Sequence, residues 1–134
     1  MMRKPKSATR LSLACIVTAI VSVVPAFALA ADAAKEAAAS EMHAGLAAKA
    51  TTIEQVHMHL HHAVNCLVGP KGQGFDAKEA NPCQSLGDGA IPDATDAAMK
   101  AKLTSALAHA QAGLKSNELA VAQRAAADTQ AALK

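Results

Sequence analysis

The stretch VHMHLHHAVNCLVGPKGQGFDAKEANPC, residues 56–83, decides the fold and carries most of the chemistry that this chain offers. It holds four of the six histidines of the sequence and runs from a helix-prone segment into a glycine-rich loop. Gly69 followed by Pro70 is typical of a helix end, because glycine suits the C-terminal cap and proline cannot continue the helix. We therefore expect the last turns of a helix to carry His57, His59, His61 and His62.

Upstream of this loop, apolar residues recur in alternating steps of four and three, the pattern of a helix that packs at a shallow angle in a bundle. The seam consists of Met42, Leu46, Ile53, Val56, Leu60, Ala63 and Leu67. Lys49 interrupts it once. The pattern predicts one helix over residues 40–67.

Two further apolar stripes follow the glycine- and proline-rich residues 69–92. The first stripe predicts a helix that starts near Asp93 and consists of Met99, Leu103, Ala106, Ala110 and Leu114. The second runs to the end of the chain on Leu119, Ala122, Ala126, Thr129 and Leu133. Their short connection at residues 113–117 favours an antiparallel hairpin. Since no alternating strand pattern occurs, we predict an all-α fold, an antiparallel helical bundle of three main helices with one long loop.

Residues 1–30 have the layout of a secretory signal peptide. Four basic residues precede an apolar run at residues 11–24, and the small-residue sites Ala26-Phe27-Ala28 and Ala28-Leu29-Ala30 follow it. We expect cleavage after Ala30, with Ala28 as the alternative. A membrane anchor is the competing interpretation, but a bilayer span needs about 20 apolar residues. A periplasmic or secreted protein with one domain, residues 31–134, is expected.

Removal of the leader changes the charge of the protein. The whole chain is formally +2, with 13 basic and 11 acidic residues, and four of the basic ones lie in the leader. The mature chain is then −2, so its charge gives no argument for nucleic acid. We expect no nucleic-acid partner and no membrane attachment after cleavage, while a homodimer through exposed seams stays open. No nucleophile, base and orienting group occur at motif spacing, so we do not expect an enzyme.

Cys66 and Cys83 are the only cysteines outside the leader. An even pair in an exported protein is typical of a disulfide. Closing a loop of this length stabilises a fold by about 3 kcal/mol in the loop-entropy model. The alternative is a zinc or copper site with thiolate ligands, formed by His59, His62, Cys66 and Cys83.

The histidines of residues 57–62 are the candidate metal ligands, because short histidine-dense tracts commonly bind metal. His57 and His61 lie one helical turn apart on one edge of the apolar stripe, where two imidazoles can reach the same ion. His59 lies on the opposite edge and His62 faces away from the core. A tight site needs further ligands, such as His109, Met99, an acidic residue or a second subunit. Imidazole suits copper, nickel and zinc. His43 stands alone near the helix start, and we expect little of it.

The C-terminal stretch resembles a known kind of protein. LAHAQAG at residues 107–113, followed by NELA at 117–120, resembles the alanine- and histidine-bearing hairpins of small periplasmic metal-binding proteins. The resemblance covers residues 95–134 and implies reversible binding of a divalent metal. Those proteins place histidines along both helices, whereas His109 is the only histidine here.

These patterns together predict an exported helical protein that binds a transition metal reversibly, as a buffer or carrier. Two alternatives stay open. One is a structural or protein-interaction module that uses the loop between Cys66 and Cys83. The other is a bundle that binds haem non-covalently, since helix bundles host such sites. Covalent c-type haem is excluded, because no CxxCH motif is present.

Overall fold

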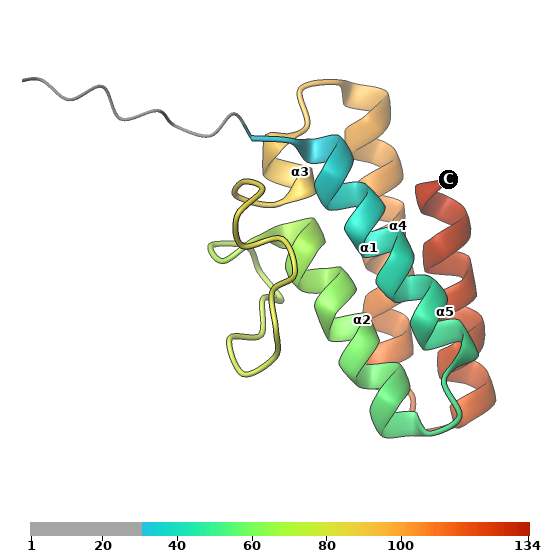
Figure 1. The fold of residues 1–134 in the computed structure, drawn as a ribbon. Helices are drawn as coiled ribbons and strands as arrows, with labels where there is room; N and C mark the ends of the chain where they lie inside the picture. Colours follow the sequence, from blue (N-terminus) through green and yellow to red (C-terminus); the bar gives the residue numbers. More distant parts are fainter. Residues whose placement is uncertain (1–30) are drawn as a thin grey trace, which may run out of the picture.

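The computed structural model describes residues 31–134, and the expected signal peptide lies outside them. The described part of the chain is all-helical and has no strand, which confirms the predicted fold class. Its elements are α1 (Ala33–Lys49), α2 (Ile53–Val68), α3 (Ala90–Asp93), α4 (Ala97–Lys115) and α5 (Leu119–Leu133) (Figure 1). Between residues 31 and 134, no helix is both long and apolar enough to span a bilayer.

Four long helices form the body of the molecule, in two antiparallel hairpins, α1–α2 and α4–α5 (Figure 1). The hairpins lie against each other, so that α1 contacts α5 and α2 contacts α4. The short α3 joins the loop to α4 at one end. The bundle therefore has four main helices, where the sequence predicted three.

The predicted helix over residues 40–67 is wrong, because residues 50–52 break it into α1 and α2. Thr52 begins the new helix: its hydroxyl oxygen accepts a hydrogen bond from the backbone N–H of Gln55 at 3.3 Å, as an N-cap residue does. Because the chain turns here and begins a new helix, the predicted apolar seam does not continue from α1 into α2. Met42 and Leu46, predicted to be buried, are 55% and 44% exposed.

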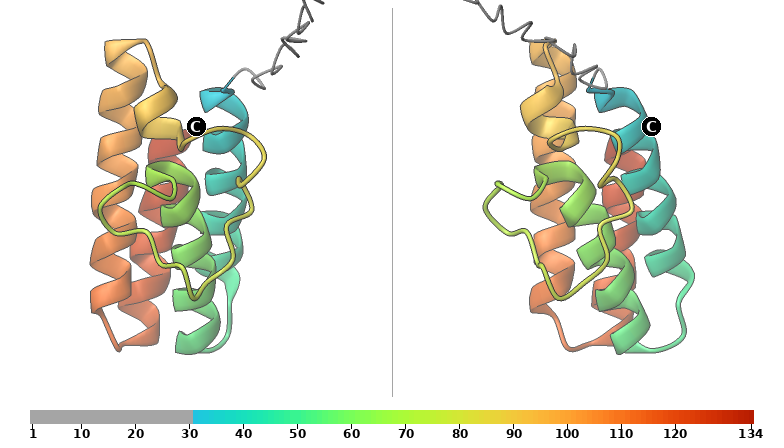
Figure 2. Two further views of the ribbon diagram at one scale, coloured as in Figure 1. Left: turned by 90° about the vertical axis from the view of Figure 1, so that its left-hand side faces the viewer. Right: turned by 60° about the vertical axis from the view of Figure 1, so that its left-hand side comes forward.

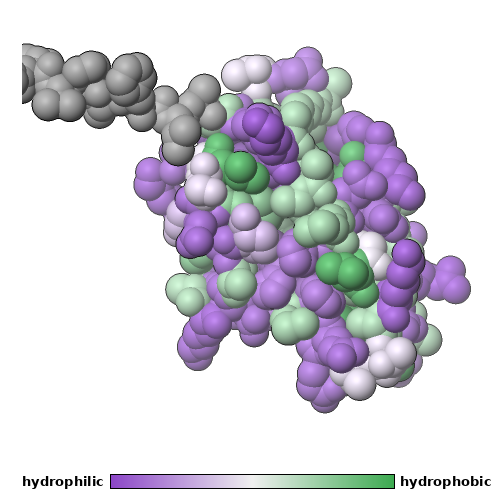
Figure 3. All heavy atoms as spheres, in the orientation of Figure 1, coloured by the Kyte–Doolittle hydropathy of each residue, from purple (hydrophilic) through white to green (hydrophobic). Residues whose placement is uncertain are grey.

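Small side chains line the buried faces of α1 and α5, which contact each other. The small buried residues are Ser40, Ala44, Gly45 and Ala47 on α1, and Ala122, Ala126 and Thr129 on α5; Glu36 of α1 is the one large side chain buried with them. Large apolar side chains gather instead on α2, where Val56, Leu60 and Leu67 are buried as predicted. The outer surface mixes hydrophilic and apolar atoms without a single large apolar area in the view of Figure 3.

Gly113 lies inside α4, where glycine lowers helix stability unless packing requires it. A Cβ atom at this position would lie 2.6 Å from Cδ1 of Leu60. Leu60 of α2 thus occupies the space that a larger residue on α4 would fill. The helix continues through Gly113 to Lys115, so the predicted turn at 113–117 is shorter and later in the structure.

The predicted start near Asp93, for the helix that follows the loop, also needs correction. Asp93 ends the short α3, and Asp96 caps α4 by accepting a hydrogen bond from the N–H of Met99 at 2.7 Å. The predicted stripes themselves are confirmed. Their centres are buried, and Met99, Leu114, Leu119 and Leu133 at their ends pack against the core.

The loop of residues 69–89 lies over the outer side of α2 (Figure 2). The expected Cys66–Cys83 disulfide closes it, with an S–S distance of 2.03 Å. Asn65, fully buried, fastens it further: its amide donates to the carbonyls of Asp76 and Ala80, and its oxygen accepts from the N–H of Asp76 at 2.8 Å. The loop is thereby held as a fixed layer against α2.

Candidate metal centre

Three histidines meet on the outer side of the α1–α2 hairpin. His43 comes from α1, and His59 and His62 come from α2. In an antiparallel hairpin, residues at equal distances from the turn lie opposite each other. His43 and His59 are both eight residues from Thr51, so the break at residues 50–52 is what brings them together.

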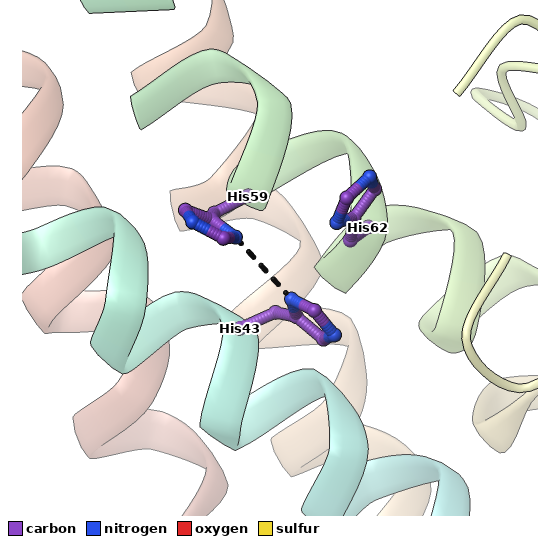
Figure 4. A group of neighbouring side chains, drawn as sticks. All are labelled: His43, His59 and His62. Carbon is purple, nitrogen blue, oxygen red and sulfur yellow. Dashed lines mark hydrogen bonds between the residues drawn. The ribbon is translucent and has the colours of Figure 1, made fainter. Parts of the chain in front are cut away.

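The imidazoles lie close enough to share an ion (Figure 4). Nδ1 of His43 and Nδ1 of His59 are 3.4 Å apart. One ring nitrogen from each of the three residues lies within 4.8 Å of those of the other two. The ring of His62 stands edge-on to the other two, with centroid distances of 5.0 Å to His43 and 5.8 Å to His59.

The surroundings favour the neutral form of two of these imidazoles, those of His43 and His62. All three residues are partly buried. Burial, together with the neighbouring imidazoles of His62 and His59, lowers the pKa of His43 to about 4. Burial and His59 also lower the pKa of His62, against an opposing effect of the Glu79 carboxylate. A neutral imidazole has a free lone pair, which is the form that binds a metal.

The distances fit a small transition-metal ion. An ion with nitrogens at 2.0–2.1 Å in a tetrahedron holds them about 3.3 Å apart. The pair formed by His43 and His59 already has this spacing, at 3.4 Å. The nitrogen of His62 lies within 4.8 Å of the other two, so a shift of its ring toward them would complete the same spacing. Three protein ligands leave a fourth position for water or another ligand, as in zinc sites that are not closed.

Comparison of the chain with protein-family models, with curated proteins and with solved structures gives no match. The interpretation of the site therefore depends on its own residues.

The structure places the predicted pair His57 and His61 away from this cluster. Nε2 of His57 donates a hydrogen bond to the carbonyl oxygen of Ser116 at 2.9 Å, which ties α2 to the turn between α4 and α5. Nδ1 of His61 lies 3.7 Å from a carboxylate oxygen of Asp76 in the loop. Neither residue belongs to the one group of metal-ligating side chains found in residues 31–134.

The other predicted ligands divide in the same way. His59 and His62 are in the cluster, whereas His109 is an exposed residue of α4 outside it. Both cysteine sulfurs are used in the disulfide, so the alternative with thiolate ligands does not hold in this structure.

His43 is the member of the cluster that sequence reasoning missed. Fourteen residues separate it from His57, and on a continuous helix it would lie far from the others. A signal was present, however: Thr52-Ile53-Glu54-Gln55 has the S/T-x-x-E/Q spacing of a helix start. A turn at this point would have predicted that His43 faces His59.

A cavity of about 540 Å³ lies elsewhere, between the loop, α3 and α4. Its wall combines apolar residues such as Val68 and Leu107 with polar ones such as Lys71, Asp88 and Lys100, and it contains no histidine. This cavity therefore gives no support to the alternative of a histidine-bound haem.

Proposed function

We propose that this protein is a small exported metal-binding protein, which holds a transition-metal ion reversibly between His43, His59 and His62 as a buffer or carrier. The observation that carries the proposal is the meeting of three imidazoles from two helices, with one ring nitrogen of each within 4.8 Å of the others. A single histidine on a helix is usually just a polar surface residue. Here three histidines converge from two helices. The pKa of one of them, His43, is lowered to about 4, and the nitrogens of His43 and His59 are 3.4 Å apart, close to the spacing around a bound ion.

Export is supported by two independent features. The leader has the composition of a signal peptide. The Cys66–Cys83 disulfide belongs to an oxidising compartment, since cytosolic thiols are kept reduced.

The ligand set favours borderline ions. Imidazole nitrogens without a thiolate or a carboxylate suit copper, nickel and zinc better than calcium or magnesium, which prefer oxygen ligands. We propose binding without catalysis, because no nucleophile and base stand at motif spacing beside the cluster.

Calorimetric titration of the untagged protein with Cu(II), Ni(II) and Zn(II) at pH 7 tests the proposal. We expect one ion per chain at micromolar affinity or tighter, with Cu(II) bound most tightly by the usual affinity order. His43→Ala should weaken binding strongly, while His109→Ala, the matched control on α4, should leave it unchanged. Affinity no better than millimolar for all three ions would overturn the proposal.

A further inference from the structure

The loop closed by the disulfide brings a carboxylate to the rear of the histidine cluster. Oε2 of Glu79 lies 3.8 Å from Nε2 of His62. The other ring nitrogen of His62, Nδ1, is buried and has no hydrogen-bond partner. In Figure 4 one nitrogen of this ring faces His43 and His59, and the other points away from them. The imidazole therefore offers one nitrogen to the cluster and the other to the loop.

A metal-bound imidazole carries its proton on the nitrogen that does not bind the ion. That N–H is commonly held by a carboxylate or a carbonyl, which fixes the tautomer and the ring orientation. The distance of 3.8 Å is longer than a direct hydrogen bond. The Glu79 side chain is 35% exposed, so it has room to turn until the bond forms.

The position of Glu79 is set by the fold of the loop. Asn65 and Cys66 follow His62 by three and four residues, so they lie on the same side of α2. Asn65 donates to the carbonyl of Ala80 at 3.1 Å, next to Glu79, and Cys66 fixes the end of the loop through Cys83. His62 therefore shares one face of α2 with Asn65 and Cys66, the two residues that hold the loop in place.

We propose that Glu79 is a positioning residue of the metal site: its carboxylate accepts a hydrogen bond from Nε2–H of His62 and so directs Nδ1 toward the ion. The Cys66–Cys83 loop, held by its disulfide and by Asn65, carries Glu79 to this place. The inference rests on the proposed function. It gives the disulfide a part in metal affinity besides its part in stability.

Calorimetric titration with Zn(II) and visible spectroscopy with Co(II) test the role of Glu79. We expect Glu79→Ala to lower affinity about tenfold to a hundredfold and to alter the Co(II) absorption at saturation, with little change in thermal unfolding. Glu79→Gln should lose less affinity, because its amide oxygen can still accept a hydrogen bond from the imidazole N–H. Asp76→Asn is the matched control, since Asp76 is the loop carboxylate beside His61, and it should bind as the wild type does.

The Cys66→Ala/Cys83→Ala variant, measured where circular dichroism shows intact helices, should lose affinity in the same direction. Wild-type affinity and an unchanged Co(II) spectrum in Glu79→Ala would overturn the inference while the metal site stands. A wild-type protein that binds neither ion would overturn the proposed function itself. An equal loss in Asp76→Asn would assign the effect to loop charge and also reject a specific role for Glu79.

Discussion

The two histidine pairs of α2 lie in the same helix but have different surroundings: one pair joins a cluster of three histidines and the other does not. His57 and His61 are one turn apart, on the edge of the apolar stripe that faces Ser116 and the loop. His59 and His62 lie toward α1, where His43 joins them. Spacing within one helix therefore did not decide which pair forms a site. The neighbouring element decided it, because only α1 supplies a third imidazole.

The largest effect we expect is a contrast between these pairs: mutation of one pair should lower metal affinity, and mutation of the other should lower stability. His59→Ala/His62→Ala removes two of three ligands and should weaken Cu(II) binding by roughly a thousandfold, about 4 kcal/mol. His57→Ala/His61→Ala should keep the affinity and lose stability instead. Calorimetric titration and urea unfolding of both double variants measure the two effects. Equal losses of affinity in both would remove the distinction between the pairs.

The loop side of α2 depends on Asn65 for its order. Asn65→Ala should lower the free energy of unfolding by about 3 kcal/mol, because the fully buried Asn65 makes three hydrogen bonds to the backbone of Asp76 and Ala80 and all three are lost. Urea denaturation measures the loss. Asn65→Asp is a sharper variant, since a carboxylate can accept from the N–H of Asp76 but cannot donate to the carbonyls, and it should be no more stable than Asn65→Ala. A loss under about 1 kcal/mol for both, the value of one ordinary hydrogen bond, would contradict this role.

The helical class, the stripes of α4 and α5 and the disulfide could all be predicted from the sequence. Each depends on local information: apolar periodicity in one segment, or the pairing of the two cysteines left outside the leader. The buried face of α1 could not be predicted. It consists of the carboxylic acid Glu36 and of small residues such as Ser40, Ala44 and Ala47, which differ little in hydrophobicity from their exposed neighbours.

The candidate site was half predictable for the same reason. His59 and His62 lie inside the histidine-dense tract, so composition alone points to them. His43 joins the cluster only through the pairing of two helices. Glu79 lies near His62 only because of the path of a loop that contains no helix or strand. No periodicity in the sequence predicts such a path.

Glu36 of α1, like the histidines of α2, reaches from a helix to the loop. Only one of its two carboxylate oxygens has a hydrogen-bond partner. Glu36 is fully buried; Oε1 accepts from the N–H of Gly89 at 3.0 Å, and Oε2 has no partner. Burial above all, with the nearby Asp93 carboxylate, raises the pKa of Glu36 from 4.5 to about 7. The folded protein thus holds this proton more tightly than the unfolded chain.

The stability that Glu36 contributes is therefore fully present below about pH 4.5 and is lost as the pH rises through about 7. Between pH 5 and pH 8 the free energy of unfolding should fall by about 2 kcal/mol from this group. In Glu36→Gln, which cannot ionise, this part of the fall should disappear. Urea unfolding of both proteins across that range measures it, and parallel pH profiles would show that Glu36 titrates as an ordinary carboxyl.

The smallest effect concerns His57 alone. Its Nε2–H bonds the carbonyl of Ser116 in the turn between α4 and α5. Replacement by alanine should cost about 1 kcal/mol, the typical value of one hydrogen bond. His57→Gln, whose amide can still donate, should recover part of that loss, while Glu54→Gln, at an exposed position one turn earlier, controls for changes at the helix surface.

Metal titration of the same variants completes the test. His57 is partly buried and belongs to the densest histidine tract, but it is not in the group of side chains that could share an ion. We therefore expect His57→Ala to leave Cu(II) affinity unchanged. A strong loss of Cu(II) affinity in His57→Ala with unchanged stability would reverse the assignment of the two sides of α2.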